Sequence, residues 1–424
     1  MKDGALKEMN YTTARRILGV FAIAAILFPP SLRADDTVTC PSPSDRSKDA
    51  STADVRRQRR ILYNLDGDAC MAFLSVKKVR KPSHPITPDS VKNIIDEIAF
   101  PGSQVDTLLL CVNAQAMYFP TKVGTMRGAL TTPEQRRKWP AQEQQRFENL
   151  QELFHAGIDP YAILLAEAKR RGMEALLTFR MNDAHGFDFL KTQFWIDHPE
   201  RRLGNALDFA SPEVCEYTFR LIEEAVRRYD CDGLELDFNR NPAFFRDGNT
   251  EERVATINTL VERVRTLLDD VGRDRGRRLV LAARVPSNFG TSPPSYPQSR
   301  AIGCDPVVWS ERGWIDFLTI SEFLWVRYDL PIRPWKTLIQ NIPIYGGIEF
   351  AEGGALDQHL TREQYQRAAH HLWSDGADGI YLFNLFSYWT DSITREPSLD
   401  VLQDLGTPTP TKDKTEKGTP PADN

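Results

Sequence analysis

A regular alternation of short apolar segments and helical patterns, running from about residue 56 to residue 405, constrains this chain more than any other feature. Each apolar segment is short and bounded by polar or turn residues, which is typical of a buried strand. A strand followed by a helix, repeated eight times, indicates a closed parallel barrel with an outer ring of helices. The eight predicted strands are Arg60–Asn64, Val105–Asn113, Glu174–Asn182, Asp232–Asn239, Arg278–Pro286, Ile315–Phe323, Ile342–Phe350 and Asp378–Phe386.

We therefore predict a single α/β domain, a (β/α)8 TIM barrel with long loops at the C-terminal face of its strands. Helix starts support this prediction, because four capping residues precede helical runs and three of them stand directly before a proline. These capping residues are Thr87, Asp159, Ser211 and Thr361. An open doubly wound sheet is the alternative, but it would carry a glycine-rich phosphate turn after its first strand, and Asn64–Asp68 is not one.

The N-terminus has the order of a secretory signal peptide. Basic residues precede an apolar run from Ile17 to Phe28, which is followed by two prolines and Ala34. The run is shorter than the roughly 20 residues that span a bilayer, so cleavage would leave an exported protein, periplasmic or secreted, with no stable membrane span. The predicted organisation is a signal peptide over 1–34, a linker over 35–55, the catalytic barrel over 56–405 and a disordered tail over 406–424.

Composition and charge exclude several classes of function. Lys and Arg number 53 against 58 Asp and Glu, and the formal net charge of −5 gives no general attraction for nucleic acid. The six cysteines show no paired metal spacing and are interpreted mostly as small buried residues. No His-x-His motif follows the first strand. We therefore predict no metal, no cofactor and no nucleic-acid partner, and the oligomeric state stays open.

Polar residues on the fourth predicted strand are expected to point into the barrel, because successive side chains of a strand alternate between its two faces. In DGLELDFN, Leu234 and Leu236 suit the contact with the helices. The same alternation then places Glu235, Asp237 and Asn239 inside the barrel.

Other strands also send polar side chains inward. Barrel interiors are normally filled by branched apolar residues, so inward charges need a partner or a ligand. One alternative is an internal ion-pair network that binds nothing, for example Glu235 with Arg180 or Arg284. The further inward residues on strands three, five and seven are Arg180, Asn182, Arg284, Tyr345 and Glu349.

Two carboxylates on opposite sides of one cleft are the minimum apparatus for cleaving a glycosidic bond. The protonated one donates to the leaving oxygen, and the other attacks the anomeric carbon or activates water. Asp237 and Glu349 end their strands and form the predicted catalytic pair. Glu322, in TISEFLW, is a reserve acid, although alternation groups it with the outward-facing Leu318 and Ile320.

The fourth strand, in the sequence YDCDGLELDFNR, resembles the glycosyl-hydrolase-like TIM barrels of secreted bacterial proteins, over roughly residues 56–405. The resemblance implies a glycosidase. The segment is also similar to chitinase-type barrels, whose fourth strand carries alternating acids that end in a catalytic glutamate. This chain departs from that pattern, because Asn239 stands at the place of the terminal glutamate. The departure argues against substrate-assisted chemistry of the chitinase type.

Two glycosidase clans bear on the roles of the carboxylates. The commonest clan of retaining enzymes has its acid at the end of strand four and its nucleophile at the end of strand seven. Asp237 and Glu349 match this placement, without the usual Asn-Glu pair on strand four. In another clan the fourth-strand aspartate is itself the nucleophile, and LELDFNR is similar to that motif too. The resemblance therefore implies the pair and leaves the two roles open.

Aromatic, basic and amide side chains near the same strand ends are predicted to shape the sugar site, since sugar rings stack on aromatic faces. The predicted substrate-binding residues are Glu235, Asn239, Arg240, Arg180, Asn182, Asp183, His185, Arg284, Tyr345, Trp195, Trp325, Asn384 and Trp389. The arginines suggest a substrate with uronate or sulfate groups. Two functions stay open at this point: an exported glycoside hydrolase that cleaves a poly- or oligosaccharide, and a barrel that binds a glycan without cleaving it.

Overall fold

The computed structural model of the chain describes residues 58–68, 71, 87–287, 296–322, 326–349, 360–383, 385 and 399–408. The predicted signal peptide, the linker and most of the predicted tail lie outside the described residues, as do Trp325, Asn384 and Trp389. Within the described part of the chain, no helix is both long and apolar enough to cross a membrane.

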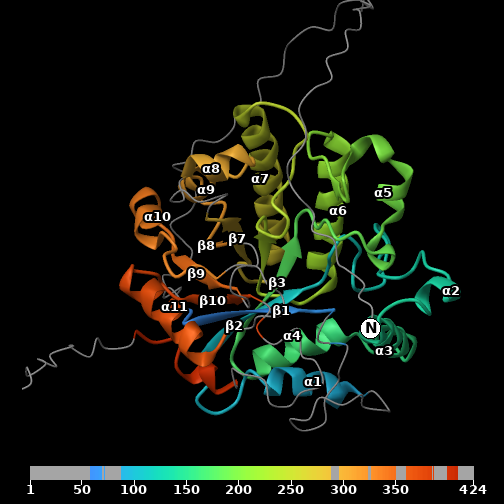
Figure 1. The fold of residues 1–424 in the computed structure, drawn as a ribbon, viewed down its shortest axis with the longest axis horizontal. Helices are drawn as coiled ribbons and strands as arrows, with labels where there is room; N and C mark the ends of the chain where they lie inside the picture. The colour runs from blue at the N-terminus through green and yellow to red at the C-terminus, as the bar shows by residue number, and fades with distance from the viewer. Residues whose placement is uncertain are drawn as a thin grey trace, which may run out of the picture. The chain divides into compact units, whose positions relative to one another are not determined.

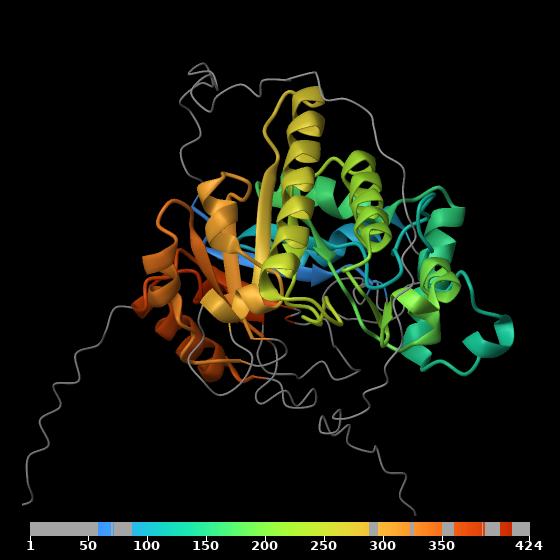
Figure 2. The same ribbon diagram turned by 90° about the horizontal axis from the view of Figure 1, so that it is seen from above.

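Eight parallel strands close into a barrel, which confirms the predicted (β/α)8 fold. Each predicted segment overlaps one strand, and the first barrel strand pairs with the last, with Ile61 opposite Ile380. Figures 1 and 2 show the strands at the centre with helices around them. In barrel order the strands are β1 (Ile61–Asp66), β2 (Val105–Cys111), β3 (Glu174–Arg180), β6 (Gly233–Asp237), β7 (Val280–Pro286), β8 (Phe317–Ser321), β9 (Ile344–Ile348) and β10 (Ile380–Phe383).

Helices follow the barrel strands and supply the outer layer. Three short 3-10 helices accompany them in the described residues: η3 (Asp188–Leu190), η4 (Pro199–Arg201) and η5 (Leu399–Gln403). The α-helices are α1 (Pro88–Asp96), α2 (Pro133–Arg136), α3 (Ala141–His155), α4 (Pro160–Arg170), α5 (Gln193–Asp197), α6 (Pro212–Arg228), α7 (Thr250–Asp274), α8 (Tyr296–Ala301), α9 (Pro306–Glu311), α10 (Ile332–Leu338) and α11 (Arg362–Ser374).

Three of the four predicted helix caps are confirmed. Thr87 and Thr361 each accept from the backbone N–H three residues later, and Asp159 accepts from the first amides of α4. Such caps satisfy N–H groups that have no partner within the helix. The fourth prediction is wrong in detail. Ser211 does precede α6, but its hydroxyl donates to Glu213 Oε2 at 2.7 Å and caps no amide.

An aspartate at the start of every second barrel strand ties that strand to the one before it. Each carboxylate accepts a hydrogen bond from the backbone N–H at the start of the preceding strand, and each also lies beside a lysine or arginine. The bond therefore satisfies an amide at the N-terminal face of the barrel, where the strand ladder begins. The four pairs are Asp106 with Arg60, Asp232 with Ala175, Asp316 with Leu281 and Asp378 with Ile344, at 3.0, 2.9, 2.8 and 2.8 Å.

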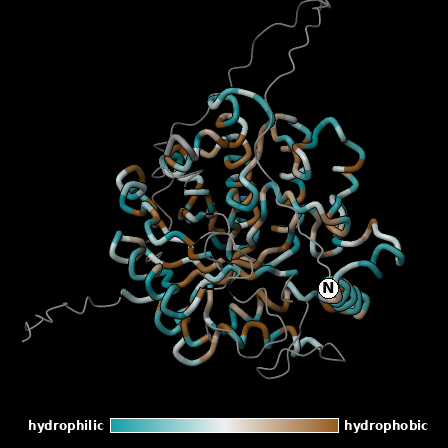
Figure 3. The backbone as a smooth tube through the Cα atoms, in the orientation of Figure 1, coloured by the Kyte–Doolittle hydropathy of each residue, from teal (hydrophilic) through white to brown (hydrophobic). Residues whose placement is uncertain are grey.

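The barrel has two separate apolar clusters, one inside it and one between the strands and the helices. Leu234 and Leu236 of β6 belong to the outer cluster, as alternation predicted. In Figure 3 the central strands are mainly hydrophobic, whereas hydrophilic and hydrophobic residues alternate along the surrounding helices. The inner cluster fills the barrel below its polar end and consists of Leu62, Leu109, Leu176, Ala282, Phe317, Tyr345, Tyr381 and Phe383.

Long loops were predicted at the C-terminal face, and the two longest segments there, 113–157 after β2 and 182–210 after β3, contain secondary structure of their own. The first holds α2 and the four-turn helix α3, which corrects its description as a loop. The second holds η3, α5, η4 and a two-stranded antiparallel sheet of β4 (Arg202–Leu203) and β5 (Ala206–Leu207). Both segments follow the carboxyl ends of barrel strands, so they build the face where barrel enzymes carry their sites.

Candidate active site

Arg284 joins the two predicted catalytic carboxylates inside the barrel. Its Nη1 donates to Asp237 Oδ2 at 3.0 Å, and its Nη2 donates to Glu349 Oε1. These three side chains come from β7, β6 and the end of β9, and all three are buried. Because β8 lies between β7 and β9, a contact from Arg284 to Glu349 must run through the barrel interior. The structure therefore brings this predicted pair together at one guanidinium.

Asp237 is held at both of its oxygens. Its Oδ1 accepts from the backbone N–H groups of Asn239 and Arg240 at 3.0 and 3.1 Å, while Oδ2 accepts from Arg284. The chain makes these bonds by turning sharply just after β6. These hydrogen bonds fix the orientation of the carboxylate.

Glu349 has one bound and one free oxygen. Its Oε2 is buried and has no hydrogen-bond partner within the described part of the chain. Burial raises the pKa of Glu349 to about 7, although Arg284 and a hydrogen bond from Ser321 act in the opposite direction. A proton on this carboxyl group is therefore available near neutral pH, and the unpartnered Oε2 is the atom that can carry it.

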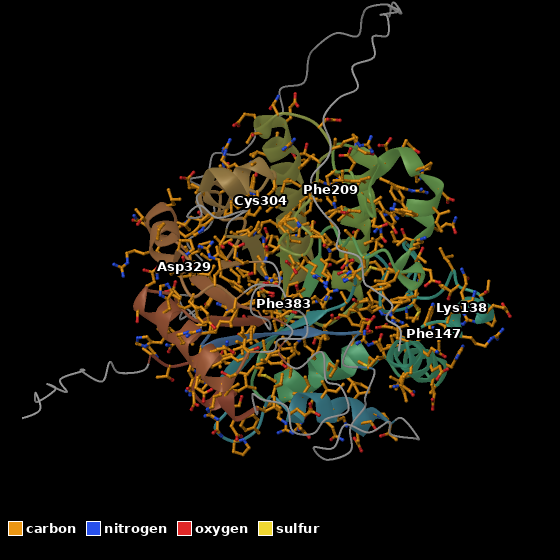
Figure 4. The ribbon with its side chains drawn as sticks, in the orientation of Figure 1. Lys138, Phe147, Phe209, Cys304, Asp329 and Phe383 are labelled. Carbon is orange, nitrogen blue, oxygen red and sulfur yellow. The ribbon has the colours of Figure 1, made fainter. Side chains whose placement is uncertain are left out.

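Ser321 and Phe383 complete the surroundings of Arg284, and sequence reasoning missed both. Ser321 Oγ accepts from Arg284 Nε at 3.0 Å and from Asn239 Nδ2 at 2.9 Å. The guanidinium lies over the ring of Phe383 at 4.1 Å from its centroid, and Figure 4 labels Phe383 among the central strands. Alternation along TISEF and IYLF would have placed both residues inside the barrel.

Glu235 lies on β6 two residues before Asp237 and is also fully buried. Its Oε1 accepts from Thr178 Oγ1 at 2.7 Å and from the Tyr381 hydroxyl at 2.9 Å. Burial and the negative charge of Asp237 raise the pKa of Glu235 to about 7. The suggested ion pair with Arg180 or Arg284 is not formed, because the hydrogen-bond partners of Glu235 are hydroxyl groups. An internal ion-pair network does exist, but its members are Arg284, Asp237 and Glu349.

A second buried ion pair joins Arg180 of β3 to Asp66 at the end of β1. The Arg180 Nη2 to Asp66 Oδ2 distance is 2.7 Å, and Arg180 Nη1 lies 3.5 Å from Asp183 Oδ2. Burial by itself would raise the pKa of Asp66, but the charges of Arg180 and its neighbours lower it. Asp66 was missed, because the predicted first strand ended at Asn64 and β1 continues for two more residues.

Asp183, His185 and Arg240 form a chain of contacts that ends at Asp237. His185 Nδ1 lies 2.6 Å from Asp183 Oδ1, and Arg240 Nη2 lies 2.9 Å from His185 Nε2. Because the guanidinium can only donate, Nε2 must accept and Nδ1 must carry the hydrogen that Asp183 receives. The backbone N–H of Arg240 then donates to Asp237 Oδ1. The three residues, all predicted substrate contacts, thus lie together beside Asp237 of the predicted catalytic pair.

Four other predicted residues have partners away from this pair. Asn182 bonds the backbone of Leu207 and Ala243 through both ends of its amide. The pKa of Glu322 is raised by burial, but its carboxylate accepts from Ser287 and Arg327. We therefore leave both out of the proposed site.

The remaining two are aromatic. Tyr345 points inward as predicted and packs edge to face against Phe317 in the inner apolar cluster, 5.2 Å between centroids. Trp195 is partly buried, and the guanidinium of Arg202 lies 3.8 Å from its ring centroid. The guanidinium of Arg202 therefore occupies a ring face of Trp195 that a stacked sugar would need.

No group of three or more His, Cys, Asp and Glu side chains could hold a metal ion in the described ranges. The four cysteines that fall in these ranges are free thiols, and three of them, Cys111, Cys231 and Cys304, are buried. The residues gathered around the predicted pair are carboxylates, arginines and His185.

No family model and no curated protein matches the chain. Among solved structures, it is similar to a GH138 enzyme targeting pectin rhamnogalacturonan II, with 12% identity over 82% of this chain and 39% of that chain and a TM-score of 0.47. It is also similar to the PgaB glycoside hydrolase domain from Bordetella bronchiseptica (13%, 83% and 99%, TM-score 0.44) and to the endo-beta-1,4-mannanase from Thermotoga petrophila (11%, 83% and 77%, TM-score 0.46). At these identities and TM-scores, the barrel is assigned from its strand pairing and the function from the chemistry of the site.

Proposed function

We propose that this protein is a glycoside hydrolase whose catalytic pair is Asp237 and Glu349. The observation that carries the proposal is the contact of both carboxylates with Arg284, at the carboxyl ends of strands on different sides of the barrel. Burial raises the pKa of Glu349, so that this member of the pair can hold a proton near neutral pH, while both oxygens of Asp237 accept hydrogen bonds. Two carboxyl groups in different protonation states are what cleavage of a glycosidic bond requires.

The environments divide the roles. Glu349 is the proposed acid: its Oε2 gives a proton to the glycosidic oxygen as the bond from that oxygen to the anomeric carbon breaks. Asp237, ionised, either attacks the anomeric carbon or takes a proton from the water that does so. Both routes leave the sugar with a free reducing end once water has been added. The contacts of Arg284 with both groups keep them within reach of one substrate bond.

Substitution of the pair tests the proposal. Reducing ends released from a broad panel of polysaccharides identify the substrate of the native protein, and the variants Asp237→Asn and Glu349→Gln are then measured on it. Each should lose activity by about 10²-fold or more, as expected when an acid or a nucleophile is removed. Glu322→Gln is the matched control, because Glu322 bonds Ser287 and Arg327 instead of the pair. Full activity of Asp237→Asn would contradict the assignment of Asp237 and Glu349 as the catalytic pair.

A barrel that binds a glycan without cleaving it is the second candidate. This candidate is favoured by the hydrogen bonding of Asp237, because both of its carboxylate oxygens already accept from Arg284 and from two backbone amides. Asn239, at the place of the chitinase-type glutamate, also favours binding without cleavage. Binding isotherms run beside the reducing-end assay separate the candidates, because saturable binding with no released sugar supports this one.

We further propose that the protein is exported, on the basis of the order of basic, apolar and small residues up to Ala34. Mass spectrometry of the protein recovered outside the cytoplasm should give the mass of a chain that begins at Asp35. A cytoplasmic protein with its first 34 residues intact would contradict the proposal.

A further inference from the structure

Three aromatic rings form a ladder at the C-terminal face, in the segment that follows β3. The rings of His185, Phe187 and Phe189 lie next to one another, with Phe187 in contact with the other two. The rings of Phe187 and Phe189 are stacked with centroids 5.1 Å apart and planes at 6°. His185 and Phe187 follow at 5.8 Å and 20°. The ladder is a continuous set of near-parallel aromatic faces.

Phe187 is the exposed member of this ladder. It is 54% exposed, the highest value among the four exposed large hydrophobic residues that the described ranges contain, and it is the only aromatic one of the four. The other three are Leu130, Ile196 and Leu338. An exposed aromatic side chain on the face that carries the candidate site has an unfavourable contact with water that a ligand would remove.

The ladder is anchored at its buried end. Phe189 is 5% exposed and packs edge to face against Trp139 at 5.0 Å, with the guanidinium of Arg127 over its ring at 4.5 Å. The backbone also holds it, since Gly128 N donates to Phe189 O at 2.8 Å. A ligand that stacks on Phe187 therefore meets a surface that needs little further ordering.

The other end of the ladder leads to the catalytic pair. His185 is fixed by Asp183 and Arg240, and the backbone N–H of Arg240 donates to Asp237. The exposed ring of Phe187 is thus linked to Asp237 through two side chains. These contacts connect the ring of Phe187 to the turn that holds Asp237.

The charges of the arginines and carboxylates near the site indicate which kind of sugar can bind there. Arg284 is bound by Asp237 and Glu349, and Arg180 by Asp66 and Asp183. The positive charge of Arg240 acts on Asp66 and Asp183 too, since it helps to lower the pKa of both. The predicted preference for uronate or sulfate groups assumed that the arginines have no carboxylate partner within the protein. Here buried carboxylates already balance them, and an anionic sugar would face those carboxylates.

We propose that Phe187, supported by His185 and Phe189, is a stacking platform that binds a neutral sugar unit of the substrate beside the Asp237–Glu349 pair. This inference rests on the proposed role in carbohydrate recognition and adds a subsite and a substrate class to it. The apolar C–H face of a neutral pyranose stacks on the ring, and its hydroxyls stay in water.

Affinity electrophoresis in gels that contain glucan, mannan, xylan or polygalacturonate tests the platform. The full-length native protein should be retarded by at least one of the three neutral polysaccharides and less by polygalacturonate. Phe187→Ala should weaken that retardation about tenfold in apparent Kd. Phe187→Trp should restore it, which a structural role for the phenyl ring would not predict. Leu338→Ala, at a residue of α10 that is 48% exposed, is the matched control and should bind as the native protein does.

The outcomes separate this inference from the proposed function. Retardation that Phe187→Ala leaves unchanged, retardation by polygalacturonate alone, or no retardation by any neutral polysaccharide each overturns the platform. If Phe187→Ala loses binding while the native protein releases no reducing sugar, the platform stands and the hydrolase proposal fails. If Asp237→Asn loses hydrolysis while Phe187→Ala keeps both KM and binding, the hydrolase stands and the platform fails.

Discussion

At the scale of single residues, Arg284 decides what the interior of the barrel can do. It is fully buried, and its Nε, Nη1 and Nη2 donate to Ser321, Asp237 and Glu349. A planar guanidinium can donate in these directions at once, whereas an ammonium group cannot hold the same geometry. The residue therefore sets both the spacing and the charge of the proposed catalytic pair.

Removal of this guanidinium should destabilise the fold. Arg284→Gln leaves Asp237 and Glu349 buried without their common cation, which typically costs about 3–5 kcal/mol of unfolding free energy. Arg284→Lys keeps the positive charge and should lose less unfolding free energy than Arg284→Gln. Urea denaturation followed by circular dichroism measures both, with Arg278→Gln as control, because the side chain of Arg278 is 51% exposed. An Arg284→Gln protein as stable as that control would show that Arg284 does not hold the pair.

The buried glutamates should make stability depend on pH. The pKa of Glu235 rises from 4.5 to about 7 because of burial and the charge of Asp237. Between those values the native state binds more protons than the unfolded state, so the unfolding free energy falls as pH increases. The contribution is complete below pH 4.5 and is lost as pH rises through 7.

Glu235→Gln should reduce this dependence. A glutamine does not titrate, so the difference in unfolding free energy between about pH 5 and about pH 8 should become smaller than in the native protein. Urea titrations at the two pH values give that difference. Glu262→Gln on the exposed face of α7 is the control and should leave it unchanged. Equal pH dependence in all three proteins would mean that Glu235 titrates normally.

At the scale of elements, the aspartates of β2, β6, β8 and β10 join the strands in pairs. Each carboxylate accepts from a backbone amide at or next to the start of the strand before it, at the N-terminal face of the barrel. The arrangement repeats four times around the barrel, so it is part of how the strands are aligned. The Asp-Gly pairs at the starts of β6 and β10 are two of its four instances.

Loss of one such aspartate should lower the free energy of unfolding. Asp378→Ala removes the acceptor of Ile344 N and the partner of Lys336, and we expect a loss of about 1–2 kcal/mol of unfolding free energy. Asp378→Asn keeps an acceptor oxygen and should recover part of it. Thermal or urea unfolding measures both against Asp270→Ala, whose exposed ion pair with Arg273 contributes little. If Asp378→Ala loses no more unfolding free energy than Asp270→Ala, water replaces the carboxylate as the acceptor of the Ile344 N–H.

At the scale of the whole molecule, closure of the barrel joins the two ends of the domain. β1 pairs with β10, and the C-terminal η5 packs next to β2, with Gln104 N donating to Leu402 O at 2.9 Å. Trp373 of α11 donates to Leu405 O at 2.8 Å. The last described residues are therefore part of the barrel, although they follow the final strand.

Truncation tests this role. A chain that ends at Ser398 loses the buried Leu402 and Leu405, and each buried leucine contributes about 1.5–3 kcal/mol. We expect a melting temperature lower by several degrees or an insoluble protein. A chain that ends at Pro408 keeps every described contact and is the control. Equal melting temperatures for the two truncated chains would show that η5 is dispensable.

The sequence by itself determined the eight strands, three of the four helix caps and the inward direction of Glu235, Asp237, Arg284 and Glu349. These features depend on local spacing, because the strand period of two and the cap at a helix start are written in neighbouring residues. Only the tertiary structure decided which charges meet. Arg284 binds Asp237 and Glu349, Arg180 binds Asp66, and Glu235 is left with hydroxyl groups. Those pairings join strands that are far apart in the chain, and the physical reason is the curvature and register of the closed barrel, which no local pattern contains.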